Sequence, residues 1–357
     1  MTGRERVLAM MDHRSVDRIP FMPITMMFAA DQIGVKYGKY VTDHQVLVEA
    51  QIRTAERFDI DQVSCISDPA REAGDLGAEV RFFEDQPPAF DESDALLRDK
   101  KALVELRIPD PLGGGRMTDR VKAAALLKEK VAGDRIVEGW IEGPCAQAAN
   151  LRGINRLMLD FIDDPVFVRD LFDFVVAMEL SFAQAQKDAG VELMGVGDAA
   201  LSLAGPAIFN QMIMPAHKKL VEGMKAMGLR TRSHMCGNTR RILKGRGELG
   251  YDIEDMDSMV PLADAHAQMP NHVILGNIAT VDVMRNGTTQ DVVNAVTKCH
   301  QDAGELYIIG AGCEVPRDTP EAHMLALLEF ARSHRPGDLQ PLQVHPGSGP
   351  AVSMQNP

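Results

Sequence analysis

Several features that would quickly assign a function are missing from this sequence of 357 residues. The formal net charge is −13 and no run of Lys or Arg offers a local exception, so a nucleic-acid backbone would be repelled. No apolar run is long enough to span a bilayer. The first residues, MTGRERVLAMMDH, carry charges where a signal peptide needs an apolar stretch. We therefore expect a cytoplasmic protein that binds neither nucleic acid nor membrane.

Cysteine is also scarce, and its five residues are Cys65, Cys145, Cys236, Cys299 and Cys313. An odd, sparse set in a cytosolic chain argues against a disulfide framework, so each is by default a buried free thiol. We expect Cys65 and Cys145 to be small core residues. Cys299 and His300 fall within an amphipathic helical pattern and are expected to be structural.

What the sequence does contain is a regular alternation of β-rich runs and helical periodicity. The predicted strands are 19–24, 62–67, 135–141, 192–197, 229–234, 252–257, 272–277 and 306–312. The helical stretches between them include 207–228 and 288–304. Eight strands separated by helices predict a (β/α)8 barrel, with a doubly wound sheet as the alternative.

The remaining segments predict one catalytic domain with additions. Residues 1–335 form the predicted barrel domain, opened by a helix that Thr2 and Glu5 begin as a capping box. Segment 68–115 is irregular and reads as an excursion that contains a small hairpin, EVRFFEDQPPAF. Residues 336–357, rich in Pro, Gly and polar residues, predict a disordered tail.

Active sites of such barrels are built at the C-terminal ends of the strands, so polar residues there are the candidates. Those that stand at the ends of the predicted strands are Asp68, Glu142, Asp198, His234, Cys236, Asp257, Asn277 and Cys313. Glu142 precedes a Gly-Pro turn, as an acid aimed into a cavity would, but a loop carboxylate fits equally well. The same two interpretations, an acid in the cavity or a loop carboxylate, apply to Asp68 and Asp198.

A metal site is the sharpest of these possibilities. His234 and Cys236 stand two apart at a strand end and so project from the same face. Cys313 follows a Gly-Ala-Gly run at the end of another strand, where glycine lets backbones approach. One imidazole and two thiolates suit zinc and leave a fourth position for a labile ligand or a substrate. Asp257 could fill that position, or it could cap the next helix.

The sequence resembles the uroporphyrinogen decarboxylase superfamily over residues 3–335. The motifs that carry this resemblance are RERVLAMMDHRSVDRIPFMP, SCISDPAREAGDLGAEVRFFEDQPP, EGPCAQAANLRG, SHMCGNT, DMDSMV, LGNIAT and GAGCEVPRDTPEAHMLALLEFAR. Within that superfamily it looks more like the corrinoid-dependent methyltransferases of the methylcobamide:coenzyme M type. That branch has a His-x-Cys…Cys zinc motif, which matches His234, Cys236 and Cys313, and an acidic residue at the place of Asp257.

The resemblance implies a (β/α)8 barrel that moves a methyl group between a methylated corrinoid protein and a zinc-activated thiol such as coenzyme M. The chain has no Asp-x-His-x-x-Gly signature of a corrinoid-binding domain, so the corrinoid is expected on a partner protein. We assign cofactor contacts to Asn277 and Met256 and catalytic roles to Glu142, Asp68 and Asp198. Core packing is the alternative for Met256, and for three further candidates for an apolar lining, Met26, Met27 and Met259. A homodimer is possible.

Three other functions compete with this prediction. The methyl group could travel from a methyl ether, methylamine or methyl halide to cob(I)amide, with zinc or Glu142 activating the leaving group. A decarboxylase is disfavoured, because segment 21–34 has no arginine to grip an acidic tetrapyrrole, although Asp68 falls near the key aspartate of those enzymes. A non-catalytic zinc scaffold would need a closed site with four protein ligands.

Overall fold

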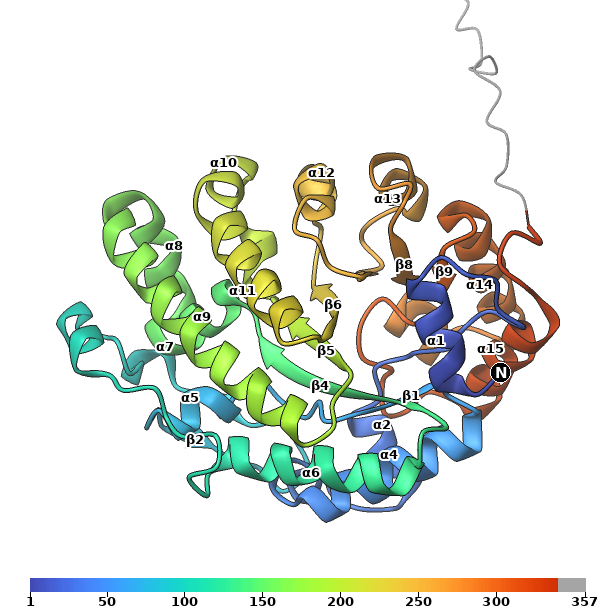
Figure 1. Ribbon diagram of the computed structural model, residues 1–357, viewed down its shortest axis with the longest axis horizontal. Coiled ribbons are helices and arrows are strands. Elements are labelled where there is room, and N and C mark those ends of the chain that lie inside the picture. The colour runs from blue at the N-terminus through green and yellow to red at the C-terminus, as the bar shows by residue number, and fades with distance from the viewer. Residues whose placement is uncertain (340–357) are drawn as a thin grey trace, which may run out of the picture.

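The computed structural model describes residues 1–339 (Figure 1). Its strands are β1 (Gln62–Ser64), β2 (Val80–Arg81), β3 (Ala89–Phe90), β4 (Ile136–Glu142), β5 (Leu193–Gly197), β6 (Arg230–Met235), β7 (Ile253–Met256), β8 (Val273–Gly276) and β9 (Tyr307–Ile308). The first helices are α1 (Gly3–Met11), α2 (Met27–Gln32), α3 (Tyr37–Thr42), α4 (His44–Phe58), α5 (Arg71–Asp75), α6 (Arg116–Val131), α7 (Pro144–Arg152) and α8 (Ile154–Asp163). The later helices are α9 (Pro165–Asp188), α10 (Pro206–Ile208), α11 (Met214–Ala226), α12 (Leu243–Gly247), α13 (Leu262–Gln268), α14 (Thr289–Ala303) and α15 (Glu321–Ser333).

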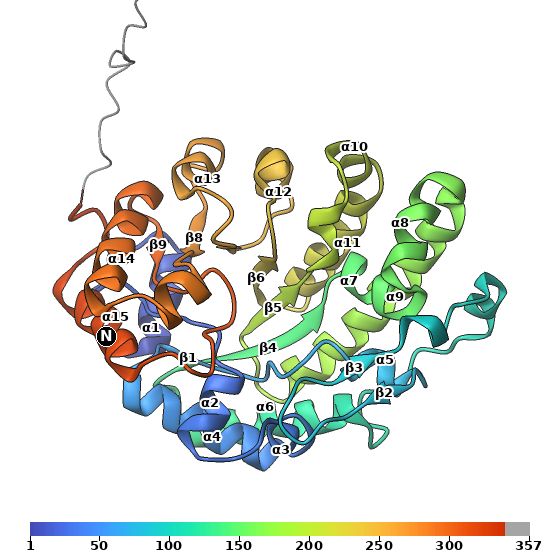
Figure 2. The same ribbon diagram turned by 180° about the vertical axis from the view of Figure 1, so that it is seen from behind.

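The architecture is an α/β barrel, as predicted. Within residues 1–339, seven strands form one parallel sheet in the order β1-β4-β5-β6-β7-β8-β9. Helices α4, α6, α9 and α11 pack against the outside of these strands (Figures 1 and 2). The parallel order places the C-terminal ends of all the strands at one edge, where the predicted site residues should meet.

The first predicted strand is the main correction to the expected barrel. Segment 19–24 makes only isolated parallel bridges, Phe21 to Ile309 and Ile24 to Glu314. It nevertheless closes the barrel, because Met22 N donates to Ile309 O at 2.9 Å and Phe21 O accepts from Asp61 N at 3.0 Å. The prolines at 20 and 23 have no N–H to donate, so a continuous ladder cannot form here. We call this junction between β9 and β1 the seam.

Helix α1 covers the end of the barrel opposite the site. Its buried residues Val7 and Met10 share a hydrophobic cluster with residues at the beginnings of the strands, among them Ile136, Leu193 and Ile253. The predicted capping box is present, since Glu5 N donates to Thr2 Oγ1 at 3.1 Å and Thr2 N to a Glu5 carboxylate oxygen at 2.9 Å. Helix α1 therefore packs over the N-terminal ends of the strands, opposite the edge where the candidate residues lie.

Segment 207–228 is helical over almost its full length, as predicted, but it is not one continuous α-helix. Helix α10 is followed by a π-helical turn, η4 (Phe209–Ile213), and then by α11. Pro215, near the beginning of α11, has no N–H for the regular i→i−4 bond and accounts for the wider turn before it. The second prediction, 288–304, is confirmed by α14, which Thr288 and Asp291 begin with a capping box.

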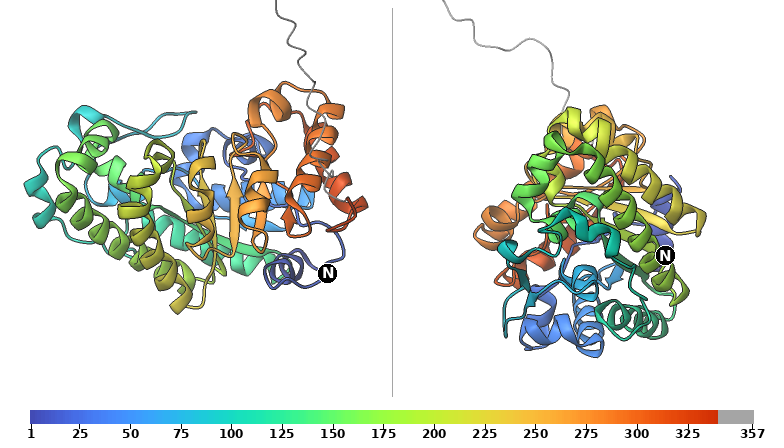
Figure 3. Two further views of the ribbon diagram at one scale, coloured as in Figure 1. Left: turned by 90° about the horizontal axis from the view of Figure 1, so that it is seen from above. Right: turned by 90° about the vertical axis from the view of Figure 1, so that its left-hand side faces the viewer.

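The excursion contains the predicted small hairpin, since β2 and β3 pair antiparallel. It also holds α5 and two 3-10 turns, η1 (Glu92–Asp94) and η2 (Lys100–Glu105). This segment lies at one end of the molecule beside α7 and α8 (Figures 2 and 3). Three further short elements connect the remaining parts: η3 (Ala200–Leu203), η5 (Arg240–Ile242) and the π-helical η6 (Thr280–Arg285).

Two sequence predictions concern the C-terminal tail and the membrane. Most of the predicted tail, residues 340–357, lies outside the described residues, and the division into 1–335 and 336–357 stays a prediction. Among the helices of residues 1–339, none has the length and hydropathy required to cross a bilayer.

Candidate metal centre

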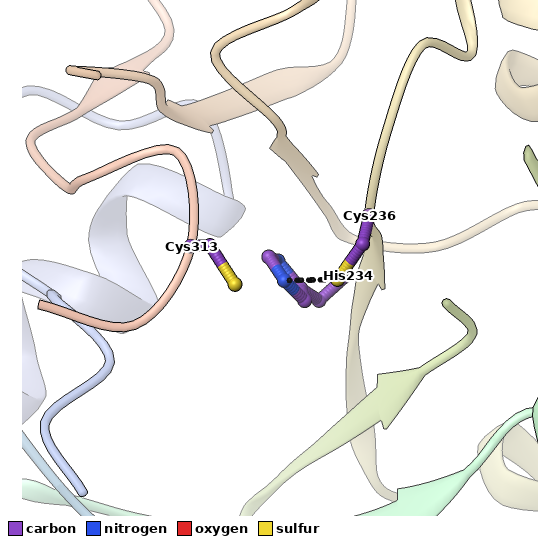
Figure 4. Close-up of side chains that lie close together, drawn as sticks. All are labelled: His234, Cys236 and Cys313. Carbon is purple, nitrogen blue, oxygen red and sulfur yellow. Dashed lines mark hydrogen bonds between the residues drawn. The ribbon is translucent and has the colours of Figure 1, made fainter. Parts of the chain in front are cut away.

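The structure brings His234, Cys236 and Cys313 together at the C-terminal edge of the sheet. One nitrogen of His234 and the two sulfur atoms all lie within 4.8 Å of one another. His234 is in β6, Cys236 directly follows that strand, and Cys313 comes from the loop after β9 (Figure 4). His234 Nε2 lies 3.2 Å from Cys236 Sγ, and Figure 4 shows the Cys313 side chain pointing toward this pair. The residues of the predicted zinc motif are therefore neighbours in space.

The glycine before Cys313 lets its loop pack closely against the loop after β7. A Cβ atom on Gly312 would overlap the backbone nitrogen of Ser258 in the loop after β7. Gly312 N also donates to Ile278 O at 2.8 Å, which fixes the loop to the segment after β8. Only a residue without a side chain fits at this approach, as the Gly-Ala-Gly run predicts.

Asp255 orients the imidazole from behind. Its Oδ2 lies 2.9 Å from His234 Nδ1 and also accepts from Arg232 Nη2 at 2.7 Å. Burial would raise the pKa of Asp255, but Arg232 and His234 outweigh it and lower that pKa, so the carboxylate is charged. Nδ1 then donates its proton to Asp255, and Nε2 is left to face the thiols. A carboxylate behind a histidine in this way is the usual support of a metal ligand.

Arg232, the second partner of Asp255, was not predicted from the sequence. Arg232 stands two residues before His234 on β6, so it projects from the same face and lies within the barrel. Its Nη1 donates to Glu138 Oε1 at 2.9 Å. An arginine inside a buried strand was the available signal, because such a cation needs paired carboxylates.

The charges and hydrogen bonds of the cluster shift the pKa values of His234 and Cys313 so that both groups are ionised. Burial would lower the pKa of His234, but the Asp255 carboxylate outweighs it and raises the pKa to about 10. A hydrogen bond from Cys236, supported by His234, lowers the pKa of the Cys313 thiol to about 4 against the effect of burial. The cluster thus holds a thiolate at Cys313 beside a proton that a cation would displace.

A cavity of about 160 Å³ opens beside the cluster. We call it the metal cavity. Its apolar wall is made by Ile24, Met26, Ile66 and Trp140. The Trp140 and His234 rings lie 6.3 Å apart between centroids. Small molecules bind in such concave sites with a few polar groups, so the cluster has room for a substrate next to it.

Of the four methionines considered for a lining, only Met26 borders the metal cavity. Met27 is half-buried, and Met259 is 59% exposed outside the cavity. Met256 has no exposed surface and packs in the hydrophobic core. It does not line the metal cavity, and its assigned cofactor contact stays a prediction.

Two of the predicted catalytic carboxylates border the metal cavity as members of ion pairs. Asp68 accepts from Arg116 Nη2 at 2.6 Å, and Glu142 Oε1 accepts from Arg71 Nη2 at 3.1 Å. Burial raises the pKa of Glu142 to about 8 despite Arg71. For Asp68, Arg116 outweighs burial and lowers the pKa. Arg71 is fully buried and also binds Glu72 at 3.2 Å. Neither arginine was predicted, because their pairing depends on how the excursion folds back.

Asp198 borders the same cavity, but its oxygens are committed to the scaffold. It accepts from the backbone nitrogens of Cys145 at 3.1 Å and Ala146 at 2.8 Å, in the first turn of α7. It also lies 2.9 Å from His217 Nε2. A carboxylate at a helix N-terminus satisfies otherwise unpaired N–H groups, so these contacts make Asp198 a positioning residue.

Asn277 and Asp257 hold the loop after β7. Asn277 Nδ2 donates to the backbone oxygens of Asp257 at 2.9 Å and Val260 at 2.6 Å, and Asn277 does not border the metal cavity. Asp257 accepts from the backbone nitrogens of Gly237 and Met259, both at 2.8 Å. Its carboxylate lies outside the group of ligand atoms within 4.8 Å. These bonds hold the loops after β6 and β7, whereas the N-cap of α13 is Pro261, so Asp257 does not cap the next helix. Its metal ligation stays a prediction.

The barrel fold and this site belong to a known class of protein. The chain is a member of the uroporphyrinogen decarboxylase (URO-D) family, whose profile matches residues 2–334. It is 27% identical to the methylcobamide:CoM methyltransferase MtbA of Methanosarcina mazei, over 94% of this chain and 98% of that protein. It is also 23% identical to the uroporphyrinogen decarboxylase of Streptomyces coelicolor, over 81% of each chain.

The solved structures agree on the fold. A methyltransferase from Methanosarcina mazei superposes with a TM-score of 0.85 at 18% identity, over 93% of this chain and 98% of that one. At such low identity the likeness concerns the architecture alone. Because the relatives include both methyltransferases and decarboxylases, the reaction has to be argued from the residues at the site.

Proposed function

We propose that this protein is a zinc-dependent corrinoid methyltransferase, which moves a methyl group between a methylated corrinoid protein and a small thiol. Coenzyme M (CoM), which forms part of the names of the methyltransferase relatives, belongs to that substrate class. The observation that carries the proposal is the cluster of one imidazole and two thiols within 4.8 Å, bordering a cavity. Three protein ligands with room for a fourth are typical of catalytic rather than structural zinc.

The residues present fit a zinc ion. His234 Nε2, Cys236 Sγ and Cys313 Sγ would hold it, and Asp255 keeps the His234 ring in the required tautomer. When bound, zinc lowers the pKa of a substrate thiol, whose free value is about 8.5, so that it is deprotonated at neutral pH. The apolar wall around Trp140 excludes water from the sulfur, which keeps the sulfur nucleophilic.

The reaction balances without a further reagent. The thiol releases its proton, its sulfur forms a bond to the methyl carbon, and the cobalt–carbon bond of the corrinoid breaks. The electron pair of that bond stays on cobalt, which leaves as cob(I)amide, and the product is a methyl thioether. The site lies at the open end of the barrel, so a corrinoid carried by a partner protein can cover it.

The reverse direction is a second candidate, because one observation favours it. Glu142 borders the metal cavity, and burial raises its pKa to about 8, so it is mainly protonated at neutral pH. A protonated acid can donate to the oxygen or nitrogen that leaves a methyl ether or methylamine when cob(I)amide takes the methyl group.

The test joins metal analysis to methyl transfer. Zinc per chain is measured by mass spectrometry, and the protein is incubated with methylcobalamin and thiols while cob(I)alamin is followed by its visible spectrum. A second set supplies cob(I)alamin with methoxylated aromatics and methylamines. We expect one zinc per chain and thiol methylation. A protein that binds almost no zinc and transfers methyl in neither direction would contradict the proposal.

Matched cysteine variants separate catalysis from scaffolding. Cys313→Ala should lose zinc and turnover while the circular dichroism spectrum stays native. Cys299→Ala, which removes a buried thiol outside the cluster, should keep both zinc and turnover. If Cys313→Ala unfolds the chain and the natural sequence never transfers a methyl group, the metal is a structural one.

A further inference from the structure

The β2–β3 hairpin of the excursion stands beside a space that adjoins the metal cavity (Figure 2). A second cavity of about 350 Å³ shares Pro69, Glu142 and Ala199 with the metal cavity. The two ends of the hairpin line this second cavity, since Glu79 directly precedes β2 and Phe90 ends β3. A displacement of the hairpin would therefore change the surroundings of the metal cavity.

The hairpin has little apolar packing to hold it in place. Most residues from 81 to 89 are exposed, and among them Phe82 is 47% and Phe83 is 37% exposed. Two ladder pairs join its strands. A two-stranded hairpin of this size is at best marginally stable by itself. Its position therefore depends on polar contacts with the rest of the molecule.

Asp85 provides the contacts that hold the hairpin on the segment before α3 and on its first turn. Its Oδ1 accepts from Tyr37 N at 3.0 Å, and its Oδ2 accepts from Lys36 Nζ at 2.9 Å. Next to it, Glu84 O accepts from Gly38 N at 2.9 Å. The hydrogen bond from Lys36 lowers the pKa of Asp85 to about 2, so this carboxylate is charged at neutral pH.

Asp85 is also bound from the segment that carries the metal ligand Cys313. Arg317 lies four residues after Cys313 and donates Nη2 to Asp85 Oδ1 at 3.2 Å and Nη1 to Asp85 O at 3.3 Å. The same guanidinium binds Asp31 in α2 through Nε at 3.0 Å and Nη2 at 2.6 Å. A single exposed ion pair contributes little, but this guanidinium joins two carboxylates and a backbone oxygen. Segment 313–317 therefore connects the metal cluster to the hairpin.

Phe82 connects the hairpin to another part of the cavity wall. Its ring lies 5.4 Å from the Arg116 guanidinium carbon, measured to the ring centroid. Arg116 in turn donates to Asp68 at 2.6 Å, and Asp68 lines the metal cavity. The hairpin thus makes contacts toward both the metal-ligand segment and the wall of the metal cavity.

From these contacts we propose that the β2–β3 hairpin is a lid beside the metal cavity, and that the Asp85–Arg317 contact couples its closure to metal binding at Cys313. The inference rests on the metal site of the proposed function and not on the direction of methyl transfer. Zinc held by Cys313 restricts segment 313–317, so Arg317 stays where it meets Asp85. Because coupling between two sites is reciprocal, the closed lid raises zinc affinity by the factor by which zinc stabilises the closed lid.

Cleavage by trypsin after Arg81 measures opening of the lid. Arg81 is exposed within β2, and the fragments are quantified by mass spectrometry. Such cleavage follows the population of the open form when opening and closing are fast. We expect zinc to slow the cleavage by about fivefold or more, compared with the same protein after removal of zinc by a chelator. A synthetic peptide of residues 76–92 reports any direct effect of zinc on trypsin.

Arg317→Met removes the coupling contact, and Lys36→Met is its matched control. Lys36 is also a cation bound to Asp85, but it precedes α3 and does not belong to the metal-ligand segment. Both variants should be cleaved faster without zinc. Zinc should still protect the lid in Lys36→Met and should protect it no longer in Arg317→Met. In competition with a chromophoric chelator, zinc affinity should fall in Arg317→Met and stay unchanged in Lys36→Met.

The outcomes separate this inference from the proposed function. Zinc that binds without slowing cleavage after Arg81, or that protects the lid equally in Arg317→Met, would overturn the coupling and leave the proposed methyl transfer intact. A chain that binds no zinc would overturn both proposals, and metal analysis of the natural sequence identifies that case independently of the cleavage rates.

Discussion

The support of His234 by Asp255 makes a quantitative prediction about zinc affinity. Asp255→Asn keeps the shape of the side chain but removes the charge that accepts the Nδ1 proton at 2.9 Å. A hydrogen bond to a charged group contributes about 1.5–3 kcal/mol. Each factor of ten in affinity corresponds to about 1.4 kcal/mol. We therefore expect zinc affinity to fall by about tenfold to hundredfold, the usual cost of losing such a partner.

The assay is a competition between the protein and a chromophoric chelator for zinc, at fixed pH and ionic strength. Glu254→Gln is the matched control, because Glu254 is the neighbouring residue on β7 and is equally buried. It pairs with Arg246 at 2.9 Å, as Asp255 pairs with Arg232 at 2.7 Å, but it does not contact His234. Both variants should lower the free energy of unfolding, while only Asp255→Asn lowers zinc affinity. Equal zinc affinities for the two variants would refute the reasoning.

Two further predictions concern stability. Gly312→Ala should lower the melting temperature and zinc affinity, because its Cβ overlaps the backbone of Ser258, whereas Gly205→Ala, whose Cβ meets no atom within 4 Å, should change neither. Burial lowers the pKa of His300, stacked on Tyr307, from 6.5 to about 4. The unfolded chain therefore takes up a proton before the folded one, and the free energy of unfolding should fall by up to about 3 kcal/mol between pH 6.5 and 4. His300→Phe should remove that part of the acid dependence in chemical denaturation, and parallel curves for the two proteins would contradict this assignment.

The fold could be predicted from the sequence because strands and helices alternate regularly along the chain, and few architectures have this alternation. The errors fall where proline changes the hydrogen bonding. Segment 19–24 reads as a strand by composition, but the prolines at 20 and 23 leave it with isolated bridges. Pro215 interrupts a helix whose apolar periodicity is otherwise continuous. In both places the missing N–H was visible in the sequence, and its local consequence was underestimated.

Of the candidate site, only the cluster of His234, Cys236 and Cys313 was predictable from the sequence. The spacing of His234 and Cys236 and the glycines before Cys313 depend on local backbone geometry, which a sequence pattern records. The ion pairs of Arg71 and Arg232 depend on strand register and on the path of the excursion, so no local pattern identifies their partners. The lining of the metal cavity also depends on strand register and on the path of the excursion, so no local pattern predicts it.

The seam has a consequence for the order in which the molecule is completed. Residues 19–24 are made first and Cys313 near the end, yet Ile24 and Glu314 are partners across the seam. A ribosome must therefore synthesise almost the whole chain before the barrel can close. The proposed metal ligands at the end of β6 cannot meet Cys313 until then. Zinc that binds only the closed form stabilises it by about 4 kcal/mol at a thousandfold excess over its dissociation constant. The ion would thus join the last part of the chain to the middle, so that opening of the seam and release of the metal become one event.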